Sequence, residues 1–484
     1  MTHQPTGHTR AVILGGSLAG TLAAAALAPH VAEVLVLERD RTLPETAAPR
    51  PRLPQAAHAH MLWSGGADAI EDLLPGTTDR WLGAGAHRIP IPNGMVSYSA
   101  AGWYRRWSET HYLIGASRDL IDWGVRTAAL AIPNVRVRTG MTVTSLVGDA
   151  SKVTGVRVRG EGKEGKEESV IDADLVVDTT GRGSKVLEWL AQIGGPVVEE
   201  TVVDAGVRYA SRRYRAPEGA EADWPVIHIQ ADPREGKPGQ VVSIISIEDG
   251  QWHVSLSGTR GGEPTADEAL FEEFARAVRH PLAAEFLARA EPISDVVVYG
   301  RTANRQRRFE KAAMPAGFVV LGDAATSLNP VYGHGMSAAA LGAVALRDTA
   351  AKTPVNAPEF AAQAQKAVVR PADAAWLLAV GQDRFYPGTI GKAPSLADKL
   401  AARYVHRLSR TAIGNFHVVK ALTDVMTMKK PASVLGKPGV LFAAARGLRR
   451  PLLKGPELTE REQSILDREP LLRGPHEDAG RVGR

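Results

Sequence analysis

The stretch AVILGGSLAG, residues 11–20, decides the fold class, because it joins a short apolar run to a glycine-rich turn. Residues 11–14 have the apolar character of a buried strand, and the Ala- and Leu-rich residues 21–28 predict a helix. A second apolar run, residues 34–37, ends in Glu38. The order of strand, glycine-rich turn, helix, strand and acid predicts a βαβ unit with parallel strands.

The glycine-rich turn meets the requirements of a dinucleotide site. A tight turn, close approach to a diphosphate and close packing of helix on strand each favour a residue without a Cβ atom. Gly15 and Gly20 take the first and third of these places, and Ser17, with a small hydroxyl that can donate to phosphate, takes the second. Glu38, 18 residues beyond Gly20, is placed to accept hydrogen bonds from a ribose diol. A glycine-rich hexad alone also occurs in ordinary tight turns, but the strand, helix and acid together favour FAD or NAD.

Two later apolar runs, residues 175–178 and 318–321, each lead into a turn that contains Gly or Asp. We expect them to lie beside the first two strands, with their turns at the carboxyl edge of the sheet. Residues 333–338 formally read G-x-G-x-x-A, but no apolar strand immediately precedes them and no suitable acid follows. They therefore predict a helix N-terminus directed at an electron-rich group.

The composition limits the class of protein. A chain of 484 residues with 44% hydrophobic and 23% charged residues is typical of a globular protein with two or three lobes. The absence of Cys excludes disulfides, thiolate catalysis, Cys-ligated zinc and iron–sulfur clusters. The polar start of the chain holds no signal core, and no apolar stretch reaches the length of about 18 residues that a membrane span needs. We expect a soluble, cytoplasmic protein.

The charge is unevenly distributed. Residues 391–484 carry 18 Lys and Arg against 9 Asp and Glu, whereas the rest of the chain carries 40 against 44. Such a basic segment can dock nucleic acid, an anionic membrane or an acidic carrier protein, although a solvated helical face is the commoner interpretation. Aromatic residues do not alternate with the basic ones as in a single-strand groove, which argues against nucleic acid.

Three sequence motifs in this order resemble the single-component (group A) FAD-dependent monooxygenases. They are Gly15–Gly20 with Glu38-Arg39, Leu321-Gly322-Asp323-Ala324-Ala325, and Asn329-Pro330-Val331-Tyr332-Gly333-His334-Gly335-Met336-Ser337. Within that family, three further segments are most similar to bacterial squalene-epoxidase-like enzymes, the polyene epoxidases of polyether pathways. These segments are residues 34–40, 50–60 and 62–66.

The resemblance implies a site for FAD and assigns residues to its parts. The residues that would bind the ADP half are Gly15, Gly16, Ser17, Gly20, Glu38 and Arg39, and Arg118 would bind the pyrophosphate. Asp323 would bind the ribityl chain, and the backbone N–H groups of Gly335 and Met336 would bind the N1–C2=O edge of the flavin. Further flavin contacts would come from His58, His60 and Pro330. Two alternatives stay open: Arg118 as an exposed helix residue, and the two histidines as ordinary loop residues. The histidine pair lacks a third ligand, so no metal site is expected.

The same resemblance, together with the residue patterns, implies an α/β fold with four parts. The Rossmann-like FAD-binding domain would comprise residues 1–60, 111–194 and 306–345, and the antiparallel-sheet substrate lobe would comprise residues 61–110 and 195–305. The helical C-terminal region would comprise residues 346–455, and the polar tail would comprise residues 456–484. Independently, the Asp249-Gly250 pair between two strand-like runs predicts a β-hairpin in the substrate lobe.

Two positions depart from the family pattern. The usual Asp-Gly motif is replaced by Asp178-Thr179-Thr180-Gly181, and Ala57 stands where the branch commonly has Arg. Because that motif is thought to serve both FAD and NADPH, the change bears on how the flavin would be reduced.

The activity implied by the resemblance is insertion of one oxygen atom from O2 through a C4a-hydroperoxyflavin, with NADPH or NADH as electron donor. We find no persuasive acid–base pair in the Trp-rich substrate lobe, which favours epoxidation of alkenes in an apolar polyene or polyketide during antibiotic biosynthesis. An acyl carrier protein is a candidate partner for the basic segment. Two alternatives keep the cofactor: a non-redox cyclase that folds a polyene for cycloaddition, and a flavin-dependent prenyl reductase.

Overall fold

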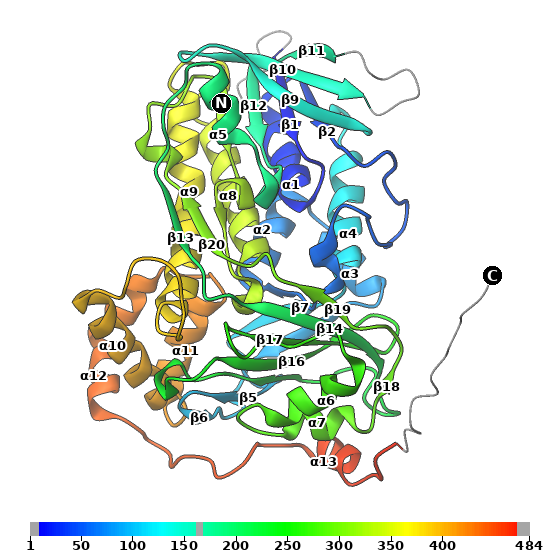
Figure 1. The fold of residues 1–484 in the computed structure, drawn as a ribbon, viewed down its shortest axis with the longest axis vertical. Helices are drawn as coiled ribbons and strands as arrows, with labels where there is room; N and C mark the ends of the chain where they lie inside the picture. Colours follow the sequence, from blue (N-terminus) through cyan, green and yellow to red (C-terminus); the bar gives the residue numbers. More distant parts are fainter. Residues whose placement is uncertain (1–8, 161–167, 472–484) are drawn as a thin grey trace, which may run out of the picture.

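The computed structural model describes residues 9–160 and 168–471, which form two sheet-based lobes beside a group of C-terminal helices (Figure 1). The first lobe contains a five-stranded parallel sheet in the order β21-β12-β1-β2-β8. Its strands are β1 (Arg10–Leu14), β2 (Glu33–Leu37), β8 (Val135–Arg138), β12 (Leu175–Asp178) and β21 (Phe318–Val320). Leu14 is in register with both Leu37 and Asp178, so the strand ends meet at one edge, as predicted.

Both faces of this parallel sheet are covered, which explains why its strands are continuous apolar runs. On one face pack α1 (Leu18–Leu27), α4 (Arg118–Leu130) and α8 (Gly335–Ala350), against residues such as Ile13 and Val36. The other face, with Val12 and Leu35, is covered by a three-stranded antiparallel sheet and α5 (Val186–Gln192). That small sheet consists of β9 (Met141–Gly148), β10 (Val153–Gly160) and β11 (Glu168–Asp172).

The second lobe is built on an eight-stranded, mainly antiparallel sheet in the order β18-β14-β17-β16-β15-β5-β6, with β19 beside β14. Its strands are β5 (Met95–Ser99), β6 (Gly102–Trp103), β14 (Arg208–Arg215), β15 (Val226–Ile229), β16 (Gln240–Ile247), β17 (Gln251–Gly258), β18 (Glu291–Pro292) and β19 (Val297–Tyr299). Asp249 and Gly250 join β16 to β17 with φ angles of 60° and 62°, which confirms the predicted hairpin.

The core of the second lobe is aromatic. Trp224 stacks on Trp252 with ring centroids 5.4 Å apart, and Phe286 meets Trp224 edge-on at 5.3 Å. Phe286 belongs to α7 (Leu282–Leu287), which covers the sheet together with α6 (Glu268–Ala277). Trp224 and Trp252 are therefore core residues of this lobe.

Residues 61–110, which the sequence analysis placed in the substrate lobe, are shared between the lobes. Leu62, Ile70 and Trp81 lie in the core that α1 and α8 form over the parallel sheet. The elements that carry them are β3 (Met61–Trp63), α2 (Ser64–Leu73) and α3 (Thr77–Gly83). Only β5 and β6 enter the eight-stranded sheet, while β4 (His87–Ile91) and β7 (His111–Gly115) pair with each other next to β3. A third small sheet, of β13 (Glu200–Val203), β20 (Asn304–Arg307) and β22 (Thr326–Ser327), also lies outside the eight-stranded sheet.

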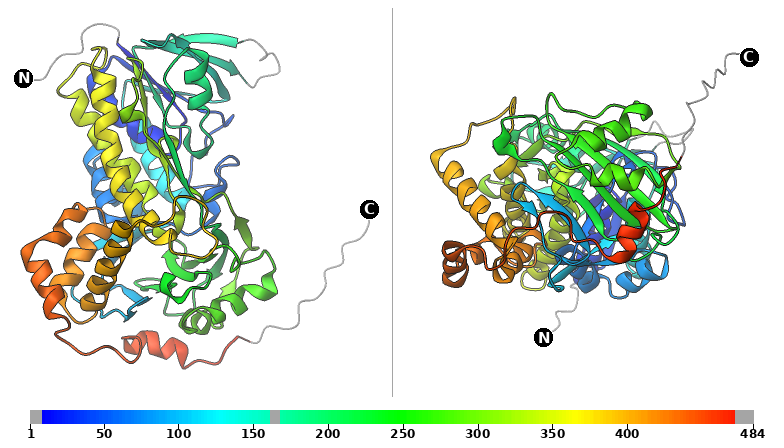
Figure 2. Two further views of the ribbon diagram at one scale, coloured as in Figure 1. Left: turned by 60° about the vertical axis from the view of Figure 1, so that its left-hand side comes forward. Right: turned by 90° about the horizontal axis from the view of Figure 1, so that it is seen from below.

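The C-terminal region is helical, as expected. α9 (Phe360–Asp383) packs along α8, and α10 (Leu396–Ala412), α11 (Phe416–Met426) and α12 (Pro438–Arg446) form a separate group (Figure 2). The chain then returns to the second lobe, where Ile465 of α13 (Glu460–Leu466) is buried in the lobe's core. Of the expected polar tail, residues 472–484 lie outside the described residues. Within the described ranges, every helix is too short or too polar to cross a bilayer.

Candidate functional site

The carboxyl edge of the parallel sheet brings most of the predicted residues together. We call the group formed by residues 15–20, Glu38, Arg118, residues 322–323 and residues 335–337 the sheet-edge site. It is assembled from the turn after β1, the end of β2, the start of α4, the turn after β21 and the start of α8. These segments are far apart in the sequence and meet because parallel strands all end at one edge.

Two positions, one in the turn between β1 and α1 and one in the first turn of α1, require glycine. Gly15 has a φ of +97°, and a Cβ atom on Gly20 would lie 1.8 Å from the carbonyl oxygen of Gly15. Ser17 precedes α1 but its side chain does not cap the helix. The first-turn N–H groups of α1 therefore remain available, and such groups favour an anion such as a diphosphate.

Glu38 is held in place by three donors. Its Oε2 accepts hydrogen bonds from the Gly16 N–H and from Arg50, both at 2.8 Å, and its Oε1 accepts one from the Asp40 N–H at 2.8 Å. Burial opposes ionisation of the carboxyl, but Arg50 and these N–H groups outweigh it and lower the pKa of Glu38. Oε1 keeps a free lone pair, which suits a ribose hydroxyl.

Arg50 is a site residue that the sequence analysis missed. It is 7% exposed, and besides Glu38 it binds Asp40 at 2.9 Å and the carbonyl oxygen of Gly16 at 3.1 Å. Its position just before a proline in an irregular loop gave no signal of this role. Arg39, in contrast, is exposed and donates to the carbonyl oxygen of Arg52 at 3.3 Å. Its assignment to the ADP half stays a prediction.

Arg118 adds a buried positive charge next to α1. It is 7% exposed, so the alternative of an exposed helix residue is wrong. Its Nε donates to Asp122 at 2.9 Å, and its Nη2 lies 3.5 Å from the Ser17 hydroxyl at the start of α1. Ser117 caps α4 by accepting from the Leu120 N–H at 3.1 Å and thereby fixes the start of the helix that carries Arg118.

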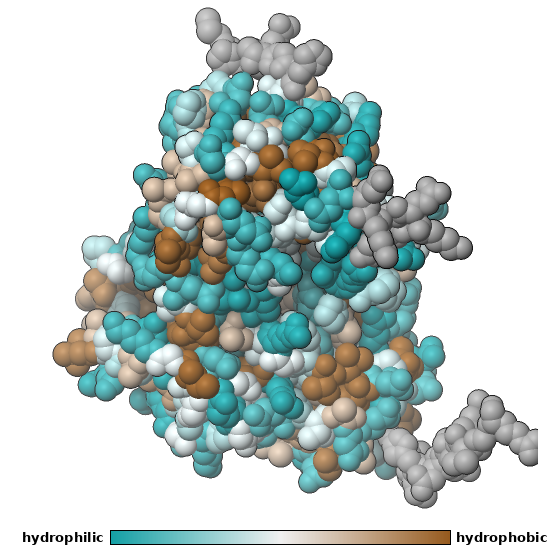
Figure 3. Space-filling view, turned by 45° about the horizontal axis from the view of Figure 1, so that its top comes forward, coloured by the Kyte–Doolittle hydropathy of each residue, from teal (hydrophilic) through white to brown (hydrophobic). Residues whose placement is uncertain are grey.

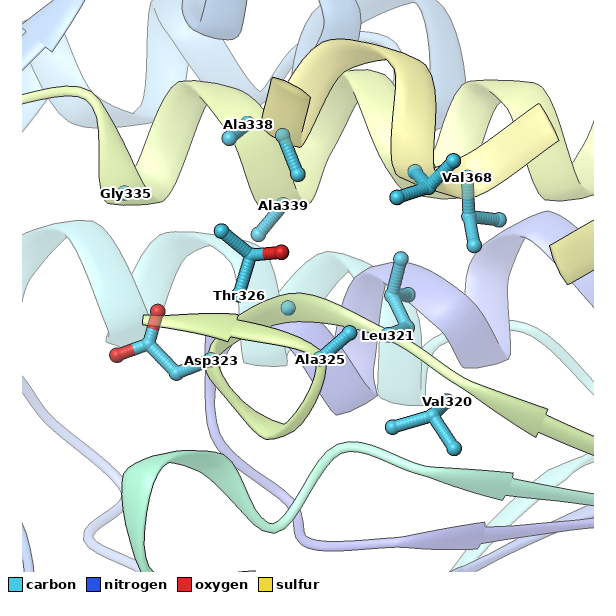
Figure 4. A pocket seen from close by; sticks show the side chains of 12 residues that line it. Val320, Leu321, Asp323, Ala325, Thr326, Gly335, Ala338, Ala339 and Val368 are labelled. Atoms are coloured by element: carbon cyan, nitrogen blue, oxygen red, sulfur yellow. The ribbon is translucent and has the colours of Figure 1, made fainter. Parts of the chain in front are cut away.

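Asp323 occupies the turn after β21, between the starts of α1 and α8. A Cβ atom on Gly322 would lie 3.1 Å from the Ala19 side chain, and one on Gly335 would lie 3.9 Å from Asp323 Oδ1. Figure 4 shows Asp323 and Gly335 at the same end of a small pocket whose other end is apolar, with Leu321 and Val368. No residue that the structure describes forms a hydrogen bond with the Asp323 carboxyl.

The electrostatic surroundings of Asp323 differ from those of Glu38. The Asp323 side chain retains solvent-accessible surface, but many protein atoms lie around its carboxyl group. The resulting desolvation raises the pKa of Asp323. The cations Arg182, Arg118 and Arg305 oppose that shift without reversing it. An exposed carboxylate without a protein donor is available to ligand hydroxyls.

The start of α8 is also uncapped. His334 precedes the helix without a side-chain cap, and the N–H groups of Gly335, Met336 and Ser337 have no acceptor among the described residues. A helix of 16 residues thus directs free N–H groups at the region of Asp323. Residues 333–338 form a helix N-terminus, as the sequence predicted.

A buried acid from α9 fixes the loop that leads into α8. Asp383, 1% exposed, accepts hydrogen bonds from Asn304 at 2.6 Å, Asn329 at 3.0 Å and the Tyr332 hydroxyl at 2.8 Å. Tyr209 of the second lobe donates to Asn329 Oδ1 at 3.1 Å. Burial raises the pKa of Asp383, although the three donors favour its ionised form. Asp383 could not be identified from the sequence, because it lies 54 residues beyond Asn329.

Taken in order, these contacts form one continuous line along the edge of the sheet. The line runs from Glu38 through Gly16 to Ser17 with Arg118, then from Ala19 to Gly322-Asp323, and ends at Gly335. It offers an acceptor for a diol, then a cation and helix N-terminus for a diphosphate, then a free carboxylate, then a second helix N-terminus.

Comparison with known proteins places the chain in a family. No protein-family model matches it. Protein Rv3254 of Mycobacterium tuberculosis (strain ATCC 25618 / H37Rv) is 32% identical over 399 residues, which cover 79% of this chain and 82% of Rv3254. The chain belongs to the family of Rv3254.

Solved structures with the fold of this Rv3254-family protein include enzymes of different chemistry. A triple mutant of the flavin-dependent brominase Bmp2 has a TM-score of 0.59 and 16% identity, covering 90% of this chain and 97% of that one. The p-nitrophenol 4-monooxygenase PnpA from Pseudomonas putida DLL-E4 has a TM-score of 0.57 and 15% identity, covering 87% and 99%. The Diels-Alderase PyrE3 has a TM-score of 0.56 and 16% identity, covering 86% and 80%. This likeness confirms the predicted fold class.

In this Rv3254-family protein, His58 and His60 differ in their hydrogen bonds but both have a lowered pKa. His58 is buried, its Nδ1 lies 2.8 Å from the Ser211 hydroxyl, and burial lowers its pKa to about 4. His60 donates from Nδ1 to the His58 carbonyl oxygen at 2.7 Å, and burial together with Arg118 keeps its pKa well below the usual value. Both rings are therefore neutral at pH 7. Their contacts with a cofactor, and those of the exposed Pro330, stay predictions.

In the segment that replaces the usual Asp-Gly motif, the side chain of Asp178 is buried within the protein. Asp178 is fully buried and accepts hydrogen bonds from the Thr180 N–H at 2.9 Å and the Ser184 hydroxyl at 2.5 Å. Arg182, four residues on, donates to the carbonyl oxygens of Ala303 and Leu328 at 2.6 and 2.7 Å. Asp178 thus shapes its own turn, and Arg182 ties that turn to the loops around Asp383.

Proposed function

We propose that the chain is an FAD-dependent monooxygenase. The observation that carries this proposal is the continuous line of binding groups in the sheet-edge site, whose order of chemistry matches an extended FAD molecule. Glu38 would accept from the adenosine ribose, and the start of α1 with Arg118 would hold the diphosphate. Asp323 would accept from the ribityl hydroxyls, and the start of α8 would face the flavin ring.

The cradle around Gly20 and the two uncapped helix starts fit such a cofactor. A side chain at Gly20 would fill the space in which a diphosphate must approach the backbone. When bound, FAD supplies the transfer of electrons from NADPH or NADH to O2 and of one oxygen atom to the substrate. The chain's own part is to orient and desolvate the site. The free N–H groups of α8 stabilise negative charge near Gly335, and Asp383 keeps the preceding loop rigid.

For the substrate we propose an apolar polyene whose alkenes are epoxidised. The support is the similarity of residues 34–40, 50–60 and 62–66 to polyene epoxidases, together with the chemistry beside the site. His58 is neutral and lies among aromatic rings, with Tyr209 and Tyr299 centroids 5.9 and 5.7 Å away. Neutral aromatic rings of this kind would suit a hydrocarbon substrate, and alkene epoxidation requires no base to deprotonate the substrate.

A second candidate function is a cyclase that binds FAD without using its redox chemistry. The observation that favours it is the inward-turned Asp178, whose hydrogen bonds to Thr180 and Ser184 leave it unable to reach a nicotinamide donor. PyrE3, a solved structure with a similar fold, is a Diels-Alderase. The prenyl reductase alternative rests on the resemblance alone.

The first experiment is to record the absorption spectrum of the purified protein and to identify any released flavin by chromatography. Stopped-flow measurements with NADPH, in air and without oxygen, then separate the candidates. A monooxygenase consumes NADPH and O2 with substrate, a reductase consumes NADPH without O2, and a cyclase consumes neither. A colourless protein that takes up no added FAD would remove the proposal altogether.

A further inference from the structure

The C-terminal helices expose large apolar side chains to solvent. On α10, Leu396 is 74% exposed and Leu400 is 56% exposed, and on α12, Leu441 is 45% and Phe442 64% exposed. Folded proteins usually bury such side chains, and exposed groups of them mark an interaction surface. Figure 3 shows hydrophobic surface, in brown, at the left edge of the molecule, where these helices lie.

The same segment is strongly basic. Residues 391–454 contain 13 Lys and Arg but only two acidic residues, Asp398 and Asp424. Both acids are already engaged: Asp398 caps α10 and pairs with Arg384, and Asp424 pairs with Lys430. Several exposed cations of this segment form no ion pair with a carboxylate among the residues that the structure describes, and six of them lie on α10, on α12 or next to α12. These are Lys399, Arg403, Arg410, Lys437, Arg446 and Arg449.

The two helices present these groups together. Leu396, Leu400 and Arg403 follow one another at helical spacing along one stripe of α10. The next residue of that stripe, Arg407, donates to the carbonyl oxygens of Ala444 and Ala445 at the end of α12, at 2.9 and 3.1 Å. Both views place α10 and α12 on the outer side of the C-terminal helices, away from the two large sheets (Figures 1 and 2).

We propose that the surface formed by α10 and α12, defined by Leu396, Leu400, Leu441, Phe442 and the six cations above, docks on an anionic lipid membrane. Apolar side chains inserted at the headgroup boundary, with Lys and Arg beside them, are the combination that holds a helix in the plane of a membrane surface. The docking is interfacial, because none of the described helices is suited to cross the bilayer.

Charge decides between a membrane and the other occupants of such a surface. A second copy of the chain, docked face to face, would bring two basic surfaces together at the cost of mutual repulsion. An acidic carrier protein with a polar docking face would match the charge but would leave Leu396 and Phe442 exposed. A bilayer with anionic lipids offers both negative charge for the cations and an apolar environment for the exposed side chains. This proposal does not depend on flavin binding.

The test is co-sedimentation of the full chain with vesicles of phosphatidylcholine alone and of phosphatidylcholine with phosphatidylglycerol, at low and high salt. We expect binding to the anionic vesicles that is at least tenfold weaker with neutral vesicles or high salt. A charge variant (Lys399→Glu with Arg403→Glu) and an apolar variant (Leu400→Ser with Phe442→Ser) should each lose at least tenfold in binding.

The matched control is Leu270→Ser with Arg276→Glu on α6, where Leu270 is 44% exposed and Arg276 has no ion pair within the described residues. This variant should bind vesicles like the unchanged protein, and circular dichroism checks the fold of all variants. Absence of binding to anionic vesicles, or equal binding by all variants, would overturn the proposal. So would a dimer in light scattering that the two C-terminal variants abolish, or binding to an acidic carrier protein without binding to vesicles.

Discussion

Glu38 and Asp323 follow two strands of the same parallel sheet, β2 and β21, yet the protein surrounds their carboxyl groups in opposite ways. Glu38 is buried and receives hydrogen bonds from Gly16, Asp40 and Arg50, which lower its pKa. Asp323 has no hydrogen bond from the described residues, and desolvation raises its pKa. One end of the sheet-edge site is therefore completed by the protein itself, and the other is left for a ligand to complete.

The contrast has opposite consequences for stability. A carboxyl group with a lowered pKa stabilises the folded state at neutral pH, and this contribution is lost as the pH falls through the lowered value. A carboxyl group with a raised pKa destabilises the folded state once it ionises, and this cost disappears as the pH falls below its ordinary value. Glu38 belongs to the first class and Asp323 to the second. The variants below test this comparison, from the largest expected loss of stability to the smallest, with stability measured on the flavin-free protein.

Replacing Gly20 by Val should have the largest effect, because its Cβ atom would lie 1.8 Å from the Gly15 carbonyl oxygen. We expect the free energy of unfolding to fall by more than about 4 kcal/mol and flavin retention to be lost. Urea titration and flavin content after gel filtration measure the two effects. The control Gly83→Ala, where a Cβ atom meets no neighbour within 4 Å, should change stability by less than about 1 kcal/mol. Normal flavin content in Gly20→Val would contradict the site.

Asp383→Ala should lower the free energy of unfolding by about 3 kcal/mol, because it leaves Asn304, Asn329 and Tyr332 with unmet hydrogen bonds in a buried place. Flavin affinity should fall as well, since the loop before α8 loses its support. Asp373→Asn on the same helix weakens a partly exposed ion pair with Arg308 but keeps an acceptor for Gln306, and it should cost no more than about 1 kcal/mol. Equal effects of the two substitutions in urea titrations would refute the special role of Asp383.

Glu38→Gln should cost about 1–2 kcal/mol at pH 7, since Arg50 keeps Asp40 as a partner but loses one charged acceptor. The difference from the unchanged protein should begin to shrink only below about pH 4.5, where the carboxyl of the unfolded chain takes up a proton, and it should disappear as the pH falls through the lowered pKa of native Glu38. Glu33→Gln, whose partner Arg10 is 42% exposed, serves as the control with an expected cost below about 1 kcal/mol. A difference that is independent of pH would show that the Glu38 charge is not the cause.

Asp323→Asn should leave the stability of the flavin-free protein unchanged or slightly increased at pH 7, because no protein donor is lost and an unfavourable charge is removed. FAD affinity should nevertheless fall by about tenfold, since a ligand hydroxyl loses a charged acceptor. Isothermal titration with FAD and urea titration without it separate the two quantities. Loss of stability without loss of affinity would reverse the assignment of Asp323.

The parts of this fold that could be predicted are those encoded by neighbouring residues. Residues 11–38 specify a strand, a turn, a helix, a strand and an acid within one short stretch, and the structure confirms that order. The Asp249-Gly250 hairpin is equally local. The helix N-terminus within residues 333–338 could be predicted because the G-x-G-x-x-A pattern is local too.

The parts that could not be predicted depend on long-range contacts. Arg50 reaches Glu38 from a loop without periodicity, and Asp383 reaches Asn329 from the end of another helix. Residues 61–86 are apolar enough for either lobe, and only the packing of α2 against α8 decides between them. A solitary acid or cation in a single sequence carries no record of its partner.

The order of strands β21-β12-β1 has a consequence for synthesis of the chain. β1 leaves the ribosome first, but its neighbour β12 ends at Asp178 and the outer strand β21 begins only at Phe318. The nascent chain must therefore hold an incomplete sheet edge until α8 has emerged beyond residue 335. No fragment that stops earlier can contain a complete sheet-edge site. The site can therefore bind a ligand only after most of the chain has been synthesised.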